Sequence, residues 1–432
     1  MSSTTTASSR TARSKTRRGL LERLGPGLIT GASDDDPSGI ATYTQAGSLF
    51  GLGLLWTMLF SYPLMGGIQE ISARIGIVTG RGLAANLRTH AVKPVLIVVV
   101  AVLLVANSIN IAADIGAMAS SLRLLAGGRF LIYVALFGVV STGLQIFVPY
   151  HRYVPYLKWL CLAVFAYIGI AFVVRIPWTD VLANTFVPHA EWSRPWLMVF
   201  VAIFGTTISP YLFFWQASEE VEDQQIDPWE QPLNKAPEQS KYQLGRMRLD
   251  TWFGMGISNL VSFSVILTAA VVFHAHGVFN IQTTQQAAEA LQPIAGRFAH
   301  LLFSIGIIGT GLLALPVLAG SSAYAVGEAM RWPIGLEKTP SKAPAFYLVI
   351  AGMMAAGMAL NLLRVNPIAA LFWAAVINGV ASPPIMITIM LLANRRSVMG
   401  HFTLTRRLLI LGWAGTGVMT AAAAAMFITM RG

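Results

Sequence analysis

The chain has 432 residues, of which 55% are hydrophobic and only 11% are charged. Soluble domains carry about 25% charged residues, so this composition excludes an ordinary soluble protein and indicates a chain that crosses a membrane several times. The formal net charge is +11, but the basic residues fall in short loops and in the N-terminal tail, where membrane topology explains them. We therefore expect the lipid bilayer as its surroundings and no nucleic acid as a partner.

Eleven segments are long and apolar enough to span a membrane, which requires roughly 20 mostly apolar residues per helix. They are residues 26–49, 52–76, 94–125, 131–149, 153–175, 196–219, 251–275, 297–328, 343–363, 367–394 and 404–430. Residues 1–25, which begin with a stretch rich in Ser, Thr and Arg, are expected to form a disordered cytoplasmic tail. The sequence thus predicts an all-α integral membrane protein with eleven transmembrane helices.

Lys and Arg concentrate in alternate connections between these segments. The second, fourth, eighth and tenth connections are basic, whereas the loop HAHGVFNIQTTQQAAEALQPIAG carries neither residue. Cytoplasmic loops are enriched in Lys and Arg, so we expect a cytoplasmic N-terminus and, with an odd number of spans, a C-terminus outside. The expected location is the cell membrane, inner or plasma, with the chain passing through it many times.

The first predicted span contains three consecutive carboxylates, Asp34, Asp35 and Asp36, followed by Pro-Ser-Gly at 37–39. A charge at membrane depth is costly and persists only where it faces a cavity, an ion or a partner. Proline removes a backbone donor and glycine loosens the backbone, so the helix is expected to break at this point. An acidic residue at a helix break within a membrane predicts a cation site.

A second break is predicted in the sixth span, where residues 205–211 read GTTISPY. Breaks at corresponding positions of two halves are typical of inverted-repeat transporters, which bind their substrate between the halves. The chain then divides into a first repeat at 26–175, a second repeat at 196–395 and an additional helix at 404–430. The alternative is a simple kink at Pro210, because prolines are tolerated in membrane helices.

The two breaks offer hard oxygen ligands. Unwinding frees backbone carbonyls near Ser33 and Thr206, which then lack a helical partner. Asp36 adds a charged oxygen, and the hydroxyls of Thr206 and Ser209 add neutral ones. A ligand set without thiolate, thioether or imidazole suits Mg²⁺, Ca²⁺ or Mn²⁺. Because Mg²⁺ usually keeps several waters, we expect a wide, wet site with few direct protein ligands.

The segment GPGLITGASDDDPSGIATYTQAG resembles the first helix of the Nramp family of divalent-metal transporters, whose motif there is Asp-Pro-Gly-Asn. SARIGIVTGRGLA resembles the end of that family's second helix, and IAADIGAMAS resembles its third. The resemblance covers most of the membrane core and implies a leucine-transporter-like fold: an inverted 5+5 repeat with broken helices 1 and 6. It also implies a carrier that works by alternating access, not an enzyme, with a divalent metal ion as substrate, no cofactor and no obligate protein partner.

The departures from the family pattern fall in the expected metal site. Gly39 stands in place of the family's asparagine, and Ser209-Pro210-Tyr211 replaces its Met-Pro-His. Losing the methionine sulfur removes the preference for soft transition metals. Tyr211 and Ala117 occupy positions of a histidine and a glutamate that the family associates with proton coupling. A free tyrosine, with a pKa of about 10, does not shuttle protons at neutral pH.

These departures resemble the Nramp-related magnesium-transporter branch, which carries Mg²⁺ and Mn²⁺, and they imply transport without proton coupling. Other functions stay open at this point. They are a classical proton-coupled Mn²⁺/Fe²⁺ Nramp transporter, an aluminium-transporting member, an inverted-repeat carrier of amino acids or amines, and a metal sensor or scaffold. Three aspartates argue against a substrate carboxylate. An intramembrane aspartyl protease using Asp36 and Asp114 lacks the expected Gly-x-Gly-Asp motif in the third span.

Further polar residues are candidates for the ion pathway or gate, together with Tyr211. Neighbours on a helix lie about 100° apart, so Asp34 and Asp35 cannot both share the face of Asp36. They either line the approach of hydrated cations or pair with a group on another helix. Asp114 has a structural reading, as an ion pair or interhelical hydrogen bond, and a functional one. Asn378 resembles the polar residue that the family uses in span ten, as an outer gate or supporting oxygen.

The polar segment at 219–250 is expected to be a cytoplasmic, partly unstructured loop. Its acidic start, at 219–223, predicts a solvated face, since charge runs usually point into water. The alternative is an inner vestibule that concentrates cations.

Overall fold

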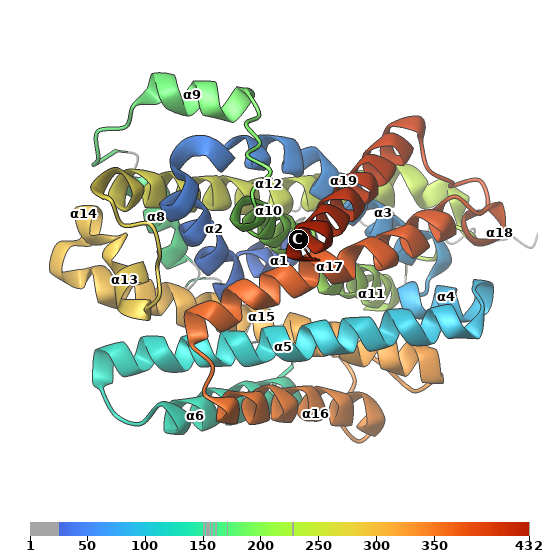
Figure 1. Cartoon of the computed structure of the whole chain (residues 1–432). Coiled ribbons are helices and arrows are strands. Elements are labelled where there is room, and N and C mark those ends of the chain that lie inside the picture. The colour runs from blue at the N-terminus through green and yellow to red at the C-terminus, as the bar shows by residue number, and fades with distance from the viewer. Residues whose placement is uncertain are drawn as a thin grey trace, which may run out of the picture.

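The computed structural model describes residues 26–149, 152, 156, 159, 162–170, 172–226 and 229–431. Within these ranges every regular element is a helix, and the helices form one bundle (Figure 1). The tail predicted at 1–25 lies outside the described residues, as do 153–155, 157, 158, 160, 161 and 171 of the span predicted at 153–175.

Most helix bounds follow the predicted spans, with the fifth and seventh spans as the exceptions. The helices are α1 (Pro26–Asp34), α2 (Pro37–Phe50), α3 (Trp56–Thr79), α4 (Leu83–His90), α5 (Lys93–Ala126), α6 (Phe130–Phe147), α8 (Ala166–Ile170), α9 (Trp178–Phe186), α10 (Arg194–Thr207), α11 (Pro210–Ile226), α12 (Ser240–Val272), α13 (Thr284–Glu289), α14 (Gln292–Ala295), α15 (Ala299–Met330), α16 (Pro344–Leu360), α17 (Pro367–Ala393), α18 (Arg396–Met399) and α19 (Arg406–Arg431). Short 3₁₀ helices join some of them, among them η2 (Gly51–Leu54) and η3 (Leu162–Phe165).

Eight helical stretches in the described part of the chain are long and apolar enough to cross a membrane. They match the third, fourth and sixth to eleventh predicted spans. A ninth is counted if the stretches Pro37–Leu54 and Trp56–Thr79, which are bent by 108° relative to each other, form one span. An all-helical chain with several membrane-spanning helices is therefore confirmed for the described residues.

The polar segment after α11 differs from its prediction. Helix α12 begins at Ser240 and not near residue 251. Before it, the backbone amides of Leu233 and Asn234 donate to the carbonyls of Ile77 and Val78 at 3.2 and 3.1 Å, which fastens this segment to the end of α3. The expectation of a partly unstructured loop is therefore wrong for the described residues 229–250, because backbone and glutamine side-chain hydrogen bonds hold them in place.

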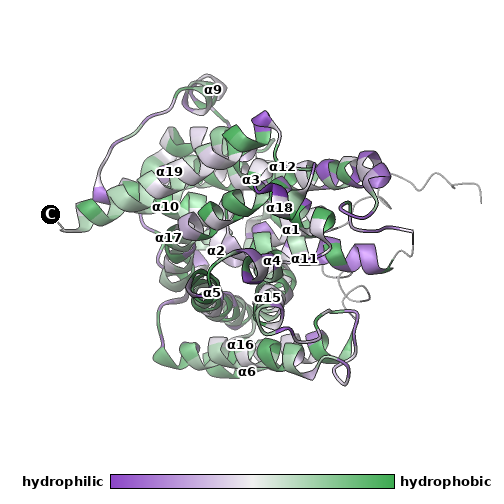
Figure 2. Ribbon diagram, turned by 90° about the vertical axis from the view of Figure 1, so that its right-hand side faces the viewer, coloured by the Kyte–Doolittle hydropathy of each residue, from purple (hydrophilic) through white to green (hydrophobic). Residues whose placement is uncertain are grey.

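The helices on either side of the two predicted breaks lie in the middle of the bundle. In Figure 1, α1, α2, α10 and α11 are surrounded by α5 and α15 below, α17 in front, and α3 and α12 behind and above. Helices α6 and α16 form an outer layer beyond α5, and the end-on view in Figure 2 shows the same arrangement. Large apolar side chains such as Ile132, Val139 and Leu348 are exposed on this outer layer, as expected of a surface that faces lipid.

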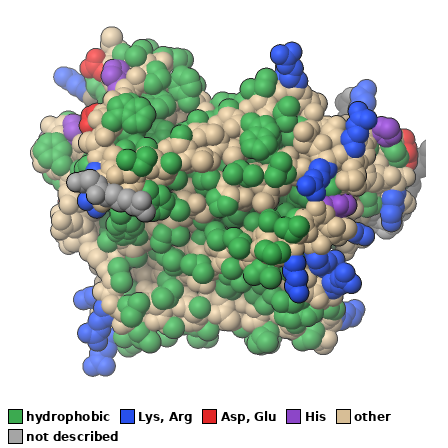
Figure 3. Space-filling model, turned by 45° about the vertical axis from the view of Figure 1, so that its right-hand side comes forward, with side chains coloured by type: hydrophobic (Ala, Val, Ile, Leu, Met, Phe, Trp, Pro, Cys, Tyr) green, Lys and Arg blue, Asp and Glu red, His purple; other side chains and the backbone are tan. Residues whose placement is uncertain are grey.

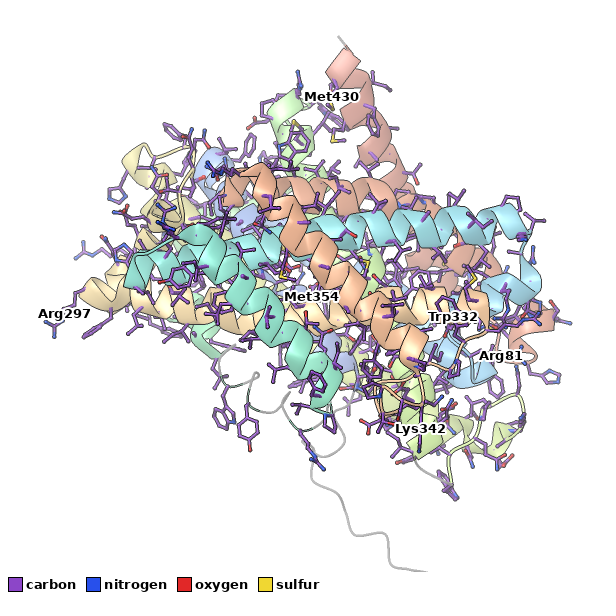
Figure 4. The ribbon with its side chains drawn as sticks, turned by 90° about the horizontal axis from the view of Figure 1, so that it is seen from below. Arg81, Arg297, Trp332, Lys342, Met354 and Met430 are labelled. Carbon is purple, nitrogen blue, oxygen red and sulfur yellow. The ribbon has the colours of Figure 1, made fainter. Side chains whose placement is uncertain are left out.

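The charged residues lie mostly toward the ends of the molecule. Hydrophobic side chains cover much of the face shown in Figure 3, and Lys and Arg side chains gather toward its edges. In Figure 4, Arg297 lies at one end, whereas Arg81 and Trp332 lie at the other. The second and eighth predicted connections thus share one end of the molecule, opposite the loop before α15, as the alternation of basic loops predicts.

Candidate metal site

The first helix interruption separates α1, which ends at Asp34, from α2, which begins at Pro37. Asp36 is the N-cap of α2: its Oδ1 accepts hydrogen bonds from the Gly39 amide at 2.8 Å and from the Ser38 hydroxyl at 2.7 Å. An aspartate N-cap followed by proline at the first helical position is a strong helix start, so these residues begin a new helix here. Asp36, which the sequence predicts as a metal ligand, therefore also stabilises the start of α2.

The second carboxylate oxygen of Asp36 belongs to a chain of amides. Asn110 on α5 donates from Nδ2 to Asp36 Oδ2 at 3.1 Å, and Asn378 on α17 donates from Nδ2 to Asn110 Oδ1 at 3.3 Å. Asp36 is only 1% exposed, and both asparagines are buried. Asn378 thus reaches the site through Asn110, a connecting role that the sequence analysis missed. The sequence feature that could have identified Asn110 is its spacing of four residues from Asp114, which places both on one helix face.

The second interruption separates α10, which ends at Thr207, from α11, which begins at Pro210. Ser209 lies in the gap, and its hydroxyl is placed to donate to the carbonyls of Gly205 at 2.7 Å and Thr206 at 2.9 Å. Ser382 on α17 is placed to donate to the Ile208 carbonyl at 2.7 Å. Hydroxyl groups therefore satisfy carbonyls that lose their partners where the helix is interrupted.

The two interruptions contact each other. The Tyr211 hydroxyl donates to the Ser33 carbonyl at 3.1 Å. A Cβ atom on Gly39 would lie only 3.0 Å from Thr206 Oγ1, so the threonine hydroxyl sits directly against the glycine backbone. The structure thus brings together the predicted residues Ser33, Asp36, Gly39, Thr206 and Tyr211. Lone pairs remain on these oxygens, because a carbonyl that accepts one hydroxyl still has a second.

The expected free carbonyls are not free. We expect from the sequence that unwinding leaves the Ser33 and Thr206 carbonyls without a helical partner, and in the structure each accepts a side-chain hydroxyl instead. From the sequence we predicted Tyr211 as the site of a lost proton function and as a pathway or gate residue, and Ser209 as a metal ligand. Both hydroxyls in fact complete the hydrogen bonding of the interruptions.

Asp34 and Asp35 meet the same residue of α12. The Ser258 hydroxyl lies 2.5 Å from Asp34 Oδ2 and 3.3 Å from Asp35 Oδ1, and both aspartates are buried. Of the two readings left open, contact with another helix is therefore present. The role of these aspartates in an ion pathway stays a prediction.

Asp114 on α5 is fully buried, and neither carboxylate oxygen has a hydrogen-bond partner among the described residues. It interacts electrostatically with Asp36. The ion pair or interhelical hydrogen bond that was one reading of Asp114 is thus not found in the described part of the chain. A buried carboxylate without such a partner is expensive, and this favours the functional reading.

The acidic run at 219–223 does not form a solvated face. Glu220 is 1% exposed, and Arg246 on α12 forms ion pairs with Glu220 at 3.4 Å and Asp223 at 3.3 Å. The Tyr324 hydroxyl lies 3.0 Å from Glu219 and 2.7 Å from Glu222. The expectation of a solvated run is wrong because α12 and α15 cover this end of α11 and supply partners.

The donor set fits a hydrated ion with few protein ligands. Among the residues that the structure describes, no group of three or more His, Cys, Asp or Glu side chains is placed to hold a metal ion. The groups at the interruptions are instead one central carboxylate, backbone carbonyls and hydroxyls. Hard cations with a partial water shell bind to such groups.

The fold and this buried polar centre define a polytopic membrane protein with a candidate cation site between two helix interruptions. The family model described as natural resistance-associated macrophage protein-like, Nramp, matches residues 27–429. The chain therefore belongs to the Nramp family.

Two curated relatives illustrate the similarity. The chain is 27% identical over 407 residues to the divalent metal cation transporter MntH of Deinococcus radiodurans, covering 92% of this chain and 87% of the relative. It is 25% identical over 418 residues to MntH of Klebsiella pneumoniae, covering 94% and 93%. These relatives are metal transporters, not enzymes, in agreement with the expectation from the sequence.

Solved structures show the same fold. An Eremococcus coleocola manganese transporter matches with a TM-score of 0.74 at 15% identity, covering 96% of this chain and 90% of that one. Mhp1, a nucleobase-cation-symport-1 family transporter in a closed conformation, matches with a TM-score of 0.56 at 14% identity, covering 94% and 93%. The fold is thus shared with Nramp and with a transporter of another family.

Proposed function

We propose that this protein is a carrier for hard divalent metal ions, Mg²⁺ and also Mn²⁺, that works by alternating access. The proposal includes eleven membrane spans, an inverted 5+5 repeat and discontinuous first and sixth spans, with the ion bound where the two interruptions meet. It places the protein in the cell membrane with the N-terminus in the cytoplasm. The family and the shared fold support the transport class.

The observation that carries the choice of ion is the replacement of side chains at the point of contact. The position of the family's asparagine is Gly39, and the Thr206 hydroxyl lies where a side chain at 39 would begin. Thr206 therefore supplies a neutral oxygen in that space. At the second interruption, Ser209 and Tyr211 bring hydroxyls where the family has sulfur and imidazole, and both of these replacements favour a hard ion.

The same contacts support transport without proton coupling. Tyr211 donates its proton to the Ser33 carbonyl, which gives the hydroxyl a structural task. The glutamate associated with coupling in the family is Ala117 here, a buried residue of α5 without a titratable group. Neither position offers a group that exchanges protons near neutral pH.

A classical proton-coupled manganese carrier is the second candidate. Asp114 favours it, because a buried carboxylate without a hydrogen-bond partner among the described residues is suited to gain and lose a proton. The matched relatives are named as divalent metal cation and manganese transporters, which fits either candidate.

The deciding experiment reconstitutes the full chain into liposomes and compares uptake of Mg²⁺, Mn²⁺, Ca²⁺ and Cd²⁺, with lumenal pH followed in parallel. The proposal expects Mg²⁺ and Mn²⁺ uptake without acidification, and weak competition by Cd²⁺. Uptake of Mn²⁺ and Cd²⁺ with proton influx and no Mg²⁺ transport favours the second candidate. Absence of any metal uptake contradicts both.

A further inference from the structure

Asp34 and Asp35 are two buried carboxylates with few hydrogen-bond donors around them. The Ser258 hydroxyl has a single hydrogen for Asp34 at 2.5 Å and Asp35 at 3.3 Å. Ser262 also lies beside Asp35, but its hydroxyl donates to the Ser258 carbonyl at 3.0 Å. The other oxygen of Asp34, Oδ1, has no hydrogen-bond partner among the described residues. The pair therefore has lone pairs directed into the protein interior that no donor satisfies.

Basic side chains do not compensate these charges. The ion pairs found in the described part of the chain involve Arg246 and Arg248, and neither reaches Asp34 or Asp35. Burying an uncompensated carboxylate is costly, and the cost grows when a second one follows in the chain. A bound cation would remove that cost.

Tyr43 gives an independent indication of a ligand at this place. It lies on α2, on the other side of the interruption, and is 1% exposed. Its hydroxyl makes no hydrogen bond to Asp34 or Asp35, although it lies near both carboxylates and near Ser262. A ligand that contacts the hydroxyl and the carboxylates together would explain why this buried group is not bonded to either aspartate.

Ser262 adds another oxygen. It lies one helical turn after Ser258, so both serines face the interruption from α12. Its hydroxyl donates to the Ser258 carbonyl at 3.0 Å, which leaves its oxygen lone pairs available near Asp35 and Tyr43. The cluster of Asp34, Asp35, Tyr43, Ser258 and Ser262 therefore presents only oxygens.

A cavity of about 150 Å³ connects to this cluster. It lies between α1, α12, α15 and η3, and among the described residues on its wall Asp35 is the one with a charged side chain, beside apolar residues such as Ala32 and Val261. The volume has room for water, and Asp35 and Thr310 give water polar partners on this wall. A hydrated cation thus has both space and an oxygen ligand beside the interruption.

We infer that the cluster of Asp34, Asp35, Tyr43, Ser258 and Ser262 binds a second hard divalent cation next to the one proposed at Asp36. This inference rests on the proposed function, because it assigns the same class of ion. Asp35 and Asp36 are consecutive in the chain, so ions held by their two carboxylates would be near neighbours. Two divalent ions leave a single positive charge against three carboxylates, whereas one ion leaves a single negative charge.

An ion at the second position would help to release the ion bound at Asp36. An ion held tightly by buried carboxylates leaves slowly, and occupation of an adjacent position lowers its affinity by repulsion. An ion arriving at Asp34 and Asp35 would therefore help to displace the ion at Asp36. The two positions share the interruption, since Asp34 ends α1 and Asp36 begins α2.

The test measures Mn²⁺ binding stoichiometry to the full-length protein in detergent by equilibrium dialysis. The wild type is expected to bind two ions per chain, and the double variant Asp34→Asn, Asp35→Asn one ion. Asp36→Asn is also expected to bind one ion. Ser258→Ala should weaken the second binding step about tenfold through loss of one oxygen ligand. Ser264→Ala, on the same helix with its hydroxyl bonded to the Leu260 carbonyl, is the matched control and should bind two ions unchanged.

Spectroscopy on the unmodified protein keeps the test valid if the double variant does not fold. With two equivalents of Mn²⁺, the electron paramagnetic resonance spectrum should show the spin coupling of a close pair. A wild type that binds one ion, two equivalents with an uncoupled spectrum, or an aspartate double variant that still binds two ions overturns the second site and leaves the Asp36 site standing. Retention of two ions by Asp36→Asn overturns the Asp36 site, and absence of any Mn²⁺ binding to the wild type overturns both.

Discussion

At both helix interruptions, a glycine before the interruption packs closely against the backbone of a neighbouring helix. Before the first, Gly31 on α1 packs against Gly254 on α12 so closely that a Cβ atom on Gly31 would lie 2.3 Å from the Gly254 carbonyl oxygen. Before the second, a Cβ atom on Gly205 of α10 would lie 2.4 Å from the Gly379 amide nitrogen on α17. Such close backbone approach requires glycine, and it fixes each half-helix to a neighbour within its last turn.

The neighbouring helix also supplies a serine to each interruption, and here the two regions differ. Ser258 of α12 contacts the carboxylates of Asp34 and Asp35, whereas Ser382 of α17 contacts the backbone carbonyl of Ile208. The first interruption therefore concentrates negative charge, and the second is neutral and satisfied by hydroxyls. For the proposed carrier, this difference predicts that the first region binds the cation and that the second shapes the site and sets the preference among ions.

Replacing the central carboxylate should have the largest effect. In Asp36→Ala the ion loses its charged ligand, and the helix α2 loses its N-cap. Hydrogen bonds and contacts to charged groups contribute about 1.5–3 kcal/mol each, so Mn²⁺ uptake into liposomes should fall roughly tenfold to a hundredfold. Asp180→Ala, an exposed acidic residue on α9, is the control and should transport normally. Wild-type uptake rates in Asp36→Ala would contradict the prediction that the first interruption binds the cation.

Adding a methyl group tests whether both regions depend on the same close packing. Gly31→Ala and Gly205→Ala should each lower the free energy of unfolding by about 1–3 kcal/mol, because backbone atoms of the neighbouring helix cannot move aside cheaply. The measurement is the thermal unfolding midpoint in detergent. Gly417→Ala on α19, where a Cβ atom meets nothing within 4 Å, should not be destabilised. If the unfolding midpoint falls in only one of the two variants, the two interruptions do not depend on the same close packing.

Restoring sulfur tests the neutral region. Ser209→Met should shift the competition between Cd²⁺ and Mg²⁺ toward Cd²⁺ by about tenfold, since a thioether is a soft ligand. Ser209→Ala removes the hydroxyl without adding sulfur and separates the chemistry of the new ligand from the loss of the hydrogen bonds to Gly205 and Thr206. Equal competition in Ser209→Met and Ser209→Ala is inconsistent with a selectivity role for this region.

Much of this fold could be predicted because its determinants are local. Apolar length predicts the spans. Asp36 marks the start of α2 by capping it, and Pro37 and Pro210 mark helix starts because a proline has no amide to donate. The start of α12 was missed because its first turns are polar, and their hydrogen bonds to the segment before α12, such as that of Gln243 to the Gln231 carbonyl, are visible only in three dimensions.

The site was predictable only in part, for the same reason. The sequence indicates which residues are chemically suitable, such as Asp36 and Thr206, but it does not show which distant residues satisfy them. Asn110 was not selected as a partner of Asp36, and Ser258 was not considered for Asp34, because each contact joins residues far apart in the chain. A hydroxyl or amide in an apolar helix has many possible partners, and only packing selects one.

The smallest expected effect concerns protons, and it tests whether the neutral region is inert. During Mn²⁺ uptake a lumenal pH dye should show no acidification, because Tyr211 donates to the Ser33 carbonyl and does not titrate near neutral pH. Tyr211→Phe should leave the dye signal flat even if uptake slows through loss of this contact. Tyr211→His places an imidazole in the same position and should make uptake depend on pH between about 5 and 8, the range in which histidine changes its charge. A wild-type dye signal proportional to metal flux would show that another buried group, with Asp114 the first to examine, carries the proton, and the second interruption would then shape the site without deciding its coupling.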